Sequence, residues 1–181
     1  MEMSKIRIYI PLAKCGDQRQ YLAGQARDAL YAQSVGIGPE DVVECLAEGE
    51  LQSQRNYSPA RIAGEAASRN LCIERAAAAA DEFFILADRD RVAFATDTIE
   101  RLQAAVSPFE TTAMVSAVDA RHCRYVDVGF CICRLSAFRQ IVPIVNLYGE
   151  CLCREINEAL AQIGFKTAYL ASSNIQFTRE V

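Results

Sequence analysis

The sequence predicts an α/β fold built on one mixed sheet, with a parallel first half and helices on its flanks. Three observations predict it. Strand patterns and helix patterns alternate along the chain. The run 82–87 is nearly continuous in apolar residues, which is typical of a strand covered on both faces. In the second half, strand patterns follow one another closely, which favours a sheet that becomes mixed there.

The first elements are a strand, a helix and a second strand. Apolar residues alternate over 5–12, so this segment is expected to be the first strand. Asp17 is suited to cap the helix that follows, and Gly36 to end it. A short strand is expected within 41–47.

A long helix should begin at Ser58 and Pro59, because a capping side chain followed by proline at the first helical position favours initiation. It should continue to about Ala80 and lead into the strand at 82–87. A further helix is expected over 94–106. The residues available for the buried side of the long helix are Ile62, Ala63, Ala66, Ala67 and Leu71.

The second half is expected to hold three strands and two helices. The strands are predicted at 112–118, 125–133 and 165–170. A short helix should follow near 135–141, and an amphipathic helix should cover 151–163.

Composition limits the classes of protein to consider. The chain has 181 residues, 51% of them hydrophobic and 23% charged, which suits one domain with a real core and excludes a disordered chain. The net charge is -4 and the basic residues form no tract, so non-specific nucleic-acid binding is not expected. No transmembrane segment or signal peptide is visible in the sequence, which predicts a cytoplasmic protein.

The chain has eight cysteines, including the pairs Cys131/Cys133 and Cys151/Cys153. Four thiolates can in principle hold a metal, but zinc ribbons use a CxxC spacing. Cys131 and Cys133 also lie in a segment that alternates like a strand. We therefore expect reduced thiols in or near the core, with a metal or disulfide framework as the less favoured alternative.

Asp88 and Asp90 follow directly after the buried strand at 82–87. In parallel α/β sheets, ligands bind at the carboxyl ends of the strands. Two carboxylates separated by one residue can hold Mg²⁺ or Mn²⁺ while substrate phosphates complete the coordination. The structural alternative is that the two aspartates cap a turn and solvate the strand end.

Four motifs then stand in a recognisable order. The first strand ends in the proline-containing stretch 10–13, and Glu48 follows the second strand. Ser68-Arg69-Asn70 lies on the long helix, and Asp88 and Asp90 follow the buried strand. In these features the sequence resembles the GT-A-type glycosyltransferases, especially the family 2-like group.

The resemblance covers about residues 5–170 and continues in the second half. The stretch 127–138 is similar to the family's strand that leads into a short helix. Gly149-Glu150-Cys151 stands where the family has Gly-Glu-Asp, and 164–166 stands where it has Gly-aromatic-Lys. Because the usual acidic residue is replaced by Cys151, Glu150 becomes the candidate general base.

The resemblance implies a Rossmann-like GT-A fold over residues 1–181, with a nucleotide-sugar-binding half at about 1–107 and an acceptor-side half at about 108–181. It implies a donor that is a nucleotide-diphosphate sugar and a Mn²⁺ or Mg²⁺ cofactor, while the acceptor stays unknown. The residues matching the family's site are Pro11, Ala13, Glu48, Arg69 and Asp88 for the donor, Asp88 and Asp90 for the metal, and Glu150 for catalysis.

We therefore expect a metal-dependent glycosyltransferase. One alternative is a glycosyltransferase-like domain that has lost catalysis and binds a partner, which the replacement at Cys151 keeps open. A sugar-nucleotidyltransferase is the less favoured alternative. Those enzymes have a glycine-rich first loop, and the loop 11–17 contains a single glycine.

Overall fold

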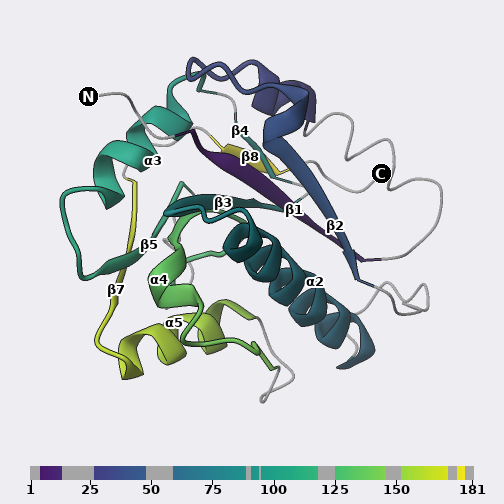
Figure 1. Cartoon of the computed structure of the whole chain (residues 1–181), viewed down its shortest axis with the longest axis vertical. Helices are drawn as coiled ribbons and strands as arrows, with labels where there is room; N and C mark the ends of the chain where they lie inside the picture. Colours follow the sequence, from purple (N-terminus) through teal and green to yellow (C-terminus); the bar gives the residue numbers. More distant parts are fainter. Residues whose placement is uncertain are drawn as a thin grey trace.

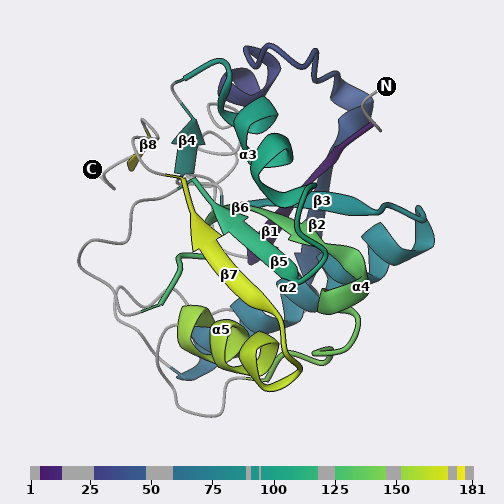
Figure 2. The same cartoon turned by 90° about the vertical axis from the view of Figure 1, so that its left-hand side faces the viewer.

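The computed structural model describes residues 5–13, 27–47, 59–88, 91–93, 95–117, 125–145, 152–170 and 175–177. Its centre is a six-stranded sheet in the order β2-β1-β3-β6-β5-β7 (Figures 1 and 2). The strands are β1 (Arg7–Ala13), β2 (Val42–Ala47), β3 (Phe83–Ala87), β5 (Thr112–Ser116), β6 (Phe130–Arg134) and β7 (Lys166–Tyr169).

The sheet is mixed, as the sequence predicted. β1 runs parallel to both of its neighbours, β2 and β3. β6 is antiparallel to β3 and to β5, and β7 runs parallel to β5. The carboxyl ends of β1, β2 and β3 therefore lie at one edge of the sheet, and the amino end of β6 meets them there.

Helices cover both faces of the sheet, which gives three layers (Figure 2). Helices α2 (Pro59–Ala78), α4 (Leu135–Phe138) and α5 (Leu152–Gln162) pack on one face. Helix α3 (Thr98–Val106) and a helical segment at 27–31 lie on the other, next to a short 3₁₀ turn, η1 (Pro39–Asp41). In the described ranges, none of the helices combines the length and apolar character that crossing a bilayer requires.

Alternation along the central strands builds a core on each face. In β3, Phe84 and Leu86 face the α2 side, whereas Ile85 and Ala87 face α3. All four side chains are almost fully buried, so the continuous apolar run reflects a strand covered on both sides. On the α2 side, Phe84 packs edge-to-face against Phe138 at 5.7 Å between ring centroids.

Two predicted boundaries differ from the structure because side chains from elsewhere satisfy the backbone. Helix α3 begins at Thr98 rather than 94, where the Ile99 amide donates to the side chain of Gln33. Strand β6 begins at Phe130 rather than 125, because both backbone groups of Val126 bond to the Asn157 side chain. These groups lie 31 residues or more from their partners, so local sequence does not reveal them.

Two further predictions differ from the structure: the buried face of α2 is partly wrong, and a second, two-stranded sheet was not predicted. Ala67, expected on the buried side of α2, is exposed, because Ala66, Arg69 and Cys72 form the side that faces the sheet. A two-stranded antiparallel sheet joins β4 (Arg91–Ala93) to β8 (Ile175–Phe177). Three-residue strands carry too little alternation to be recognised before their pairing is known.

Candidate functional site

The candidate site lies at the edge where the first three strands end. Ala13 ends β1 and pairs with Ala47, the last residue of β2. On the other side of β1, Tyr9 pairs with Leu86 of β3, and Asp88 follows directly after the end of β3. Because β1 and β3 are parallel, Asp88 lies at the same edge of the sheet as the carboxyl end of β1.

The backbone of Asp88 is fixed by the neighbouring antiparallel strand. Its amide donates to the Gly129 carbonyl at 2.6 Å, which continues the pairing of Ala87 with Phe130. The Gly129 amide in turn donates to the Asp127 side chain at 2.6 Å. Asp88 is thus held at the end of the ladder while its side chain keeps 25% of its surface exposed.

Arg69 holds the carboxylate of Asp88. Its Nη2 atom lies 2.7 Å from Oδ1 and 2.9 Å from Oδ2, and only 5% of the Arg69 side chain is exposed. Nη1 makes a longer contact of 3.5 Å with the Glu65 carbonyl. Among the described residues, Arg69 Nε finds no hydrogen-bond partner. The buried guanidinium group therefore makes its short hydrogen bonds to Asp88.

Opposing effects set the charge state of Arg69. Burial lowers the pKa of its guanidinium group, but the negative charges of Asp88 and Glu65 act in the opposite direction and prevail, so the pKa is raised. Arg69 is therefore a permanent buried cation whose main compensating charge is Asp88.

Asn70, the next residue on α2, holds a segment from the second half of the chain. Its Nδ2 donates to the Ile144 carbonyl at 3.0 Å, and its Oδ1 accepts from the Ile144 amide at 2.8 Å. This reciprocal pair fastens the segment 141–145, which contains a cis Val142–Pro143 bond, to the helix. Sequence reasoning missed this role because 74 positions separate the two partners.

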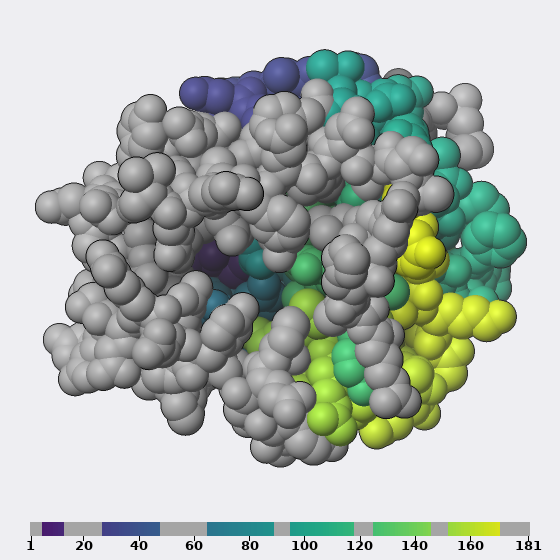
Figure 3. All heavy atoms as spheres, turned by 180° about the vertical axis from the view of Figure 1, so that it is seen from behind, coloured from purple at the N-terminus to yellow at the C-terminus, as the bar shows by residue number. Residues whose placement is uncertain are grey.

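The predicted residues are thus placed in part. Pro11 is buried in β1, Ala13 ends that strand, and Arg69 and Asp88 are in contact. Glu48, Asp90 and Glu150 lie outside the described residues. Seen from behind, atoms in the colours of β1, the α2–β3 region and the segment before β6 are visible next to one another on this face (Figure 3).

A divalent cation fits the chemistry of Asp88. A carboxylate has about four lone-pair positions, so pairing with Arg69 is compatible with metal coordination, and hard cations prefer such oxygen ligands. Within the part of the chain that the structure describes, no group of three or more His, Cys, Asp and Glu side chains is arranged as a metal site. The second expected ligand, Asp90, lies outside the described residues.

A separate groove of about 130 Å³ lies between the segment 141–145 and α5. Its lining residues include the apolar side chains of Ile144 and Ile156 and the carboxylates of Glu155 and Glu158. Because neither Asp88 nor Arg69 lines it, this groove is distinct from the carboxylate site. The contacts between Asp88 and Arg69, and not this groove, mark the candidate site at the strand ends.

No family model matches the sequence, and comparison with curated proteins finds no significant match. Solved structures do match. A mannosyltransferase from Pyrobaculum calidifontis, in complex with GDP-Man and Mn²⁺, aligns over 93% of this chain with a TM-score of 0.60 and 11% identity. The alignment covers 55% of that enzyme, so this chain spans about half of its length.

Two other solved structures are similar. A Drosophila β1,4-galactosyltransferase 7, in complex with manganese, UDP-Gal and xylobiose, aligns over 95% of this chain and 67% of its own, with a TM-score of 0.57 and 12% identity. A cytidylyltransferase from Leptospira borgpetersenii aligns over 94% and 77%, with a TM-score of 0.58 and 11% identity. Identities this low bear on the fold alone. The chain therefore has the GT-A-like fold of nucleotide-diphospho-sugar transferases.

Proposed function

We propose that this protein transfers a sugar from a nucleotide-diphosphate donor to an acceptor, with a divalent cation, Mn²⁺ or Mg²⁺, held by Asp88 and Asp90. The observation that carries the proposal is the Asp88 carboxylate. It stands at the carboxyl end of a buried parallel strand, is held by the buried Arg69, and remains partly exposed. This is where an α/β sheet of this kind binds its ligands.

Two of the similar structures support the donor class. The Pyrobaculum mannosyltransferase is in complex with GDP-Man and Mn²⁺, and the Drosophila galactosyltransferase with UDP-Gal and manganese. Both therefore combine a nucleotide sugar with a divalent cation. We extend that combination to this chain because its fold is the same and Asp88 supplies a suitable oxygen ligand.

The residues of this chain divide the work as follows. Asp88, with Asp90, binds the cation, which when bound neutralises charge on the diphosphate leaving group. Arg69, which is buried, holds the Asp88 carboxylate in position through its hydrogen bonds. Glu150 is the candidate base that accepts the proton of the acceptor hydroxyl. Pro11, Ala13 and Glu48 line the nucleotide pocket in this proposal.

Nucleotidyl transfer is the second candidate, because the cytidylyltransferase matches this fold about as well as the galactosyltransferase does, with TM-scores of 0.58 and 0.57. The products distinguish the two reactions. A glycosyltransferase releases a nucleoside diphosphate from a nucleotide sugar. A nucleotidyltransferase joins the nucleoside monophosphate part of a nucleoside triphosphate to a sugar phosphate and releases pyrophosphate. Release of pyrophosphate alone would contradict glycosyl transfer.

The first test is thermal unfolding with UDP, GDP, CDP and dTDP, each with and without Mn²⁺. A ligand at 100 times its Kd adds about 2.7 kcal/mol to the free energy of unfolding, so binding is readily detected. We expect stabilisation by one diphosphate that Mn²⁺ enhances. The absence of any shift would favour a glycosyltransferase-like binding domain without catalysis.

The variants need a design that separates binding from folding. Asp88→Asn leaves the buried Arg69 without its main counter-charge, so its own unfolding temperature should fall. Each variant is therefore compared with itself, with and without ligand. Asp90→Asn should also remove the Mn²⁺-dependent shift. The matched control is Asp97→Asn, which changes an exposed aspartate on the opposite side of the sheet and should keep the shift.

A further inference from the structure

The backbone just before strand β6 is held at two places. At the first, the Asn157 side chain on α5 bonds both backbone groups of Val126. At the second, the Gly129 carbonyl accepts the Asp88 amide at 2.6 Å. Between them, the Val128 side chain is buried in the core on the α2 side of the sheet. This stretch of backbone therefore connects α5 to the carboxylate site.

Asp88 and Gly129 continue the antiparallel pairing of β3 with β6 by one position. The last pair of the two strands is Ala87 with Phe130, so Asp88 and Gly129 stand opposite each other. In an antiparallel ladder, residues at alternate positions exchange two hydrogen bonds, one from each amide to the opposite carbonyl. The Asp88 amide bonds to the Gly129 carbonyl, so this is such a position. A regular ladder would direct the Gly129 amide to the Asp88 carbonyl.

The side chain of Asp127 binds this amide. Its Oδ1 atom accepts from the Gly129 amide at 2.6 Å. Aspartate side chains characteristically bond the backbone two residues further on, and a carboxylate acceptor makes such a bond short and strong. The bond turns the chain where it enters the ladder. Asp127 therefore marks the end of the β3–β6 pairing at the level of Asp88.

We propose that Asp127 is a positioning residue for the Asp88 carboxylate. By binding the Gly129 amide it fixes the Gly129 carbonyl, and this carbonyl fixes the backbone of Asp88. Arg69 holds the same residue by its carboxylate, so Asp88 is fixed at its main chain and at its side chain. The inference rests on the proposed function, in which this carboxylate binds the cation. Asp127 acts through Gly129 and not as a ligand of the cation.

The orientation of the Asp88 carboxylate matters because a hard cation requires oxygen ligands at defined distances. Groups that orient a metal ligand without touching the metal contribute about 10–100-fold to metal affinity or activity. Loss of the bond between Asp127 and Gly129 should therefore weaken cation binding without removing a ligand.

The test compares two substitutions at one position. Asp127→Asn keeps an Oδ1 atom that accepts from the Gly129 amide, whereas Asp127→Ala removes the acceptor. A positioning role predicts that the asparagine variant behaves like the wild type and that the alanine variant does not. A direct ligand of the cation would be impaired by both changes, because both remove the negative charge. Asp127→Ser, whose hydroxyl makes the same kind of bond more weakly, replaces the alanine variant if that variant folds poorly.

Amide hydrogen exchange measures the positioning itself and needs no ligand. In Asp127→Ala, the Asp88 amide should exchange about tenfold faster relative to the Leu86 amide. Leu86 occupies the preceding hydrogen-bonded position of the same ladder, so a loss of global stability alone would not raise this ratio. In Asp127→Asn the ratio should be unchanged.

Titration of Mn²⁺ measures the consequence for the site. The wild type and each variant are titrated in the presence of whichever of UDP, GDP, CDP and dTDP stabilises the wild type. Asp127→Ala should raise the Kd of Mn²⁺ by about 10–100-fold, and Asp127→Asn should leave it close to the wild-type value.

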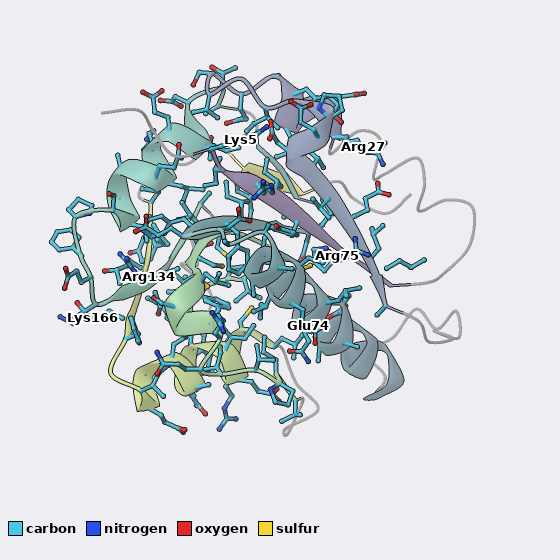
Figure 4. The ribbon with its side chains drawn as sticks, in the orientation of Figure 1. Lys5, Arg27, Glu74, Arg75, Arg134 and Lys166 are labelled. Atoms are coloured by element: carbon cyan, nitrogen blue, oxygen red, sulfur yellow. The ribbon has the colours of Figure 1, made fainter. Side chains whose placement is uncertain are left out.

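Asp41 offers a matched control, because its carboxylate also binds the amide of a nearby glycine. Its Oδ2 atom accepts from the Gly38 amide at 3.0 Å, and its Oδ1 atom lies 2.8 Å from Nζ of Lys5 (Figure 4). Asp41 directly precedes β2, so it lies at the opposite edge of the sheet from the strand ends that form the site. Asp41→Ala should lower the unfolding temperature and leave the Kd of Mn²⁺ unchanged.

Three results would overturn the inference. One is an unchanged exchange ratio in Asp127→Ala, and another is an unchanged Kd of Mn²⁺ in that variant. The third is an equal loss of Mn²⁺ affinity in Asp127→Asn and Asp127→Ala, which would make Asp127 a ligand. A wild type that binds no diphosphate with Mn²⁺ would overturn the proposed function, and with it the cation role of Asp88. A raised exchange ratio would still support the placement of Asp88 by Asp127.

Discussion

Nη2 of Arg69 lies 2.7 Å from Oδ1 and 2.9 Å from Oδ2 of Asp88, and the bond joins the interior of helix α2 to the exposed end of strand β3. The arginine is buried and the aspartate is partly solvated. A buried cation whose partner stands at the surface orients that partner. The ion pair therefore contributes to the stability of the protein and also positions the carboxylate of the proposed site.

Asp88→Asn should lower the free energy of unfolding by about 2–3 kcal/mol, because it leaves a buried charge uncompensated while solvent still reaches the site. Urea unfolding measures the loss. A double-mutant cycle with Arg69→Met provides the control, since removal of both charges should recover part of the stability. If the two losses were simply additive, the ion pair would contribute nothing.

Asn70→Ala should lower the free energy of unfolding by about 1–3 kcal/mol, because it removes two hydrogen bonds to Ile144 and leaves backbone groups unsatisfied. Hydrogen exchange of the Ile144 amide should also become faster. Gln140→Ala is the control: its bond to the Ser136 carbonyl is exposed and local, so stability should change little. Equal effects of the two variants would contradict a special role for Asn70.

Ala80 has a positive φ of 56° at the end of α2, where the Asp81 amide bonds back to the Ala76 carbonyl. Glycine adopts this conformation without strain, so Ala80→Gly should stabilise the protein by about 0.5–1 kcal/mol. Ala78→Gly, the same change in the last turn of the helix, should destabilise it by a similar amount. Thermal unfolding checks both signs, and stabilisation by both variants would contradict the explanation.

Tyr9 introduces an alkaline dependence of stability. Burial, together with the 2.8 Å bond from its hydroxyl to Asp81, raises the pKa of Tyr9 above its ordinary value of 10.0. The unfolded chain ionises first, so this contribution is present below pH 10 and is lost as the pH rises towards the raised pKa. The slope is at most about 1.4 kcal/mol per pH unit.

Denaturant unfolding from pH 9 to pH 11 measures this dependence. Tyr9→Phe should be less stable than the wild type at pH 9 because it loses the bond to Asp81, and the difference should shrink as the pH rises. Tyr169→Phe removes an exposed phenol and should behave like the wild type. A constant difference between Tyr9→Phe and wild type would contradict the raised pKa.

The sequence predicted the layered sheet because its strongest patterns are local. The run that became β3 needs no partner to be recognised, since burial on both faces makes every position apolar. The start of α2 at Pro59 was equally local. By contrast, β4 is recognised only through its pairing with β8, and the start of α3 depends on Gln33.

The candidate site was predictable as a set of residues but not as a set of contacts. Motif order singled out Arg69 and Asp88, yet nothing in that order says that one holds the other. We expected Arg69 among the donor-binding residues, and the structure shows it buried and paired with the Asp88 carboxylate. The eight cysteines indicated core thiols, and the structure buries Cys45, Cys72, Cys131, Cys133 and Cys153 in one cluster of the core.

Because Arg69 and Asn70 are consecutive, helix α2 must keep one particular rotation about its own axis for both side chains to reach their partners. Successive helical residues point about 100° apart, so one side chain turns to the sheet and the next to the segment 141–145. Inserting a single residue between Pro59 and Arg69 would leave the helix intact if its start stayed fixed. It would rotate both side chains by the same angle and detach both partners at once. The number of residues in this stretch is therefore constrained more tightly than their identity.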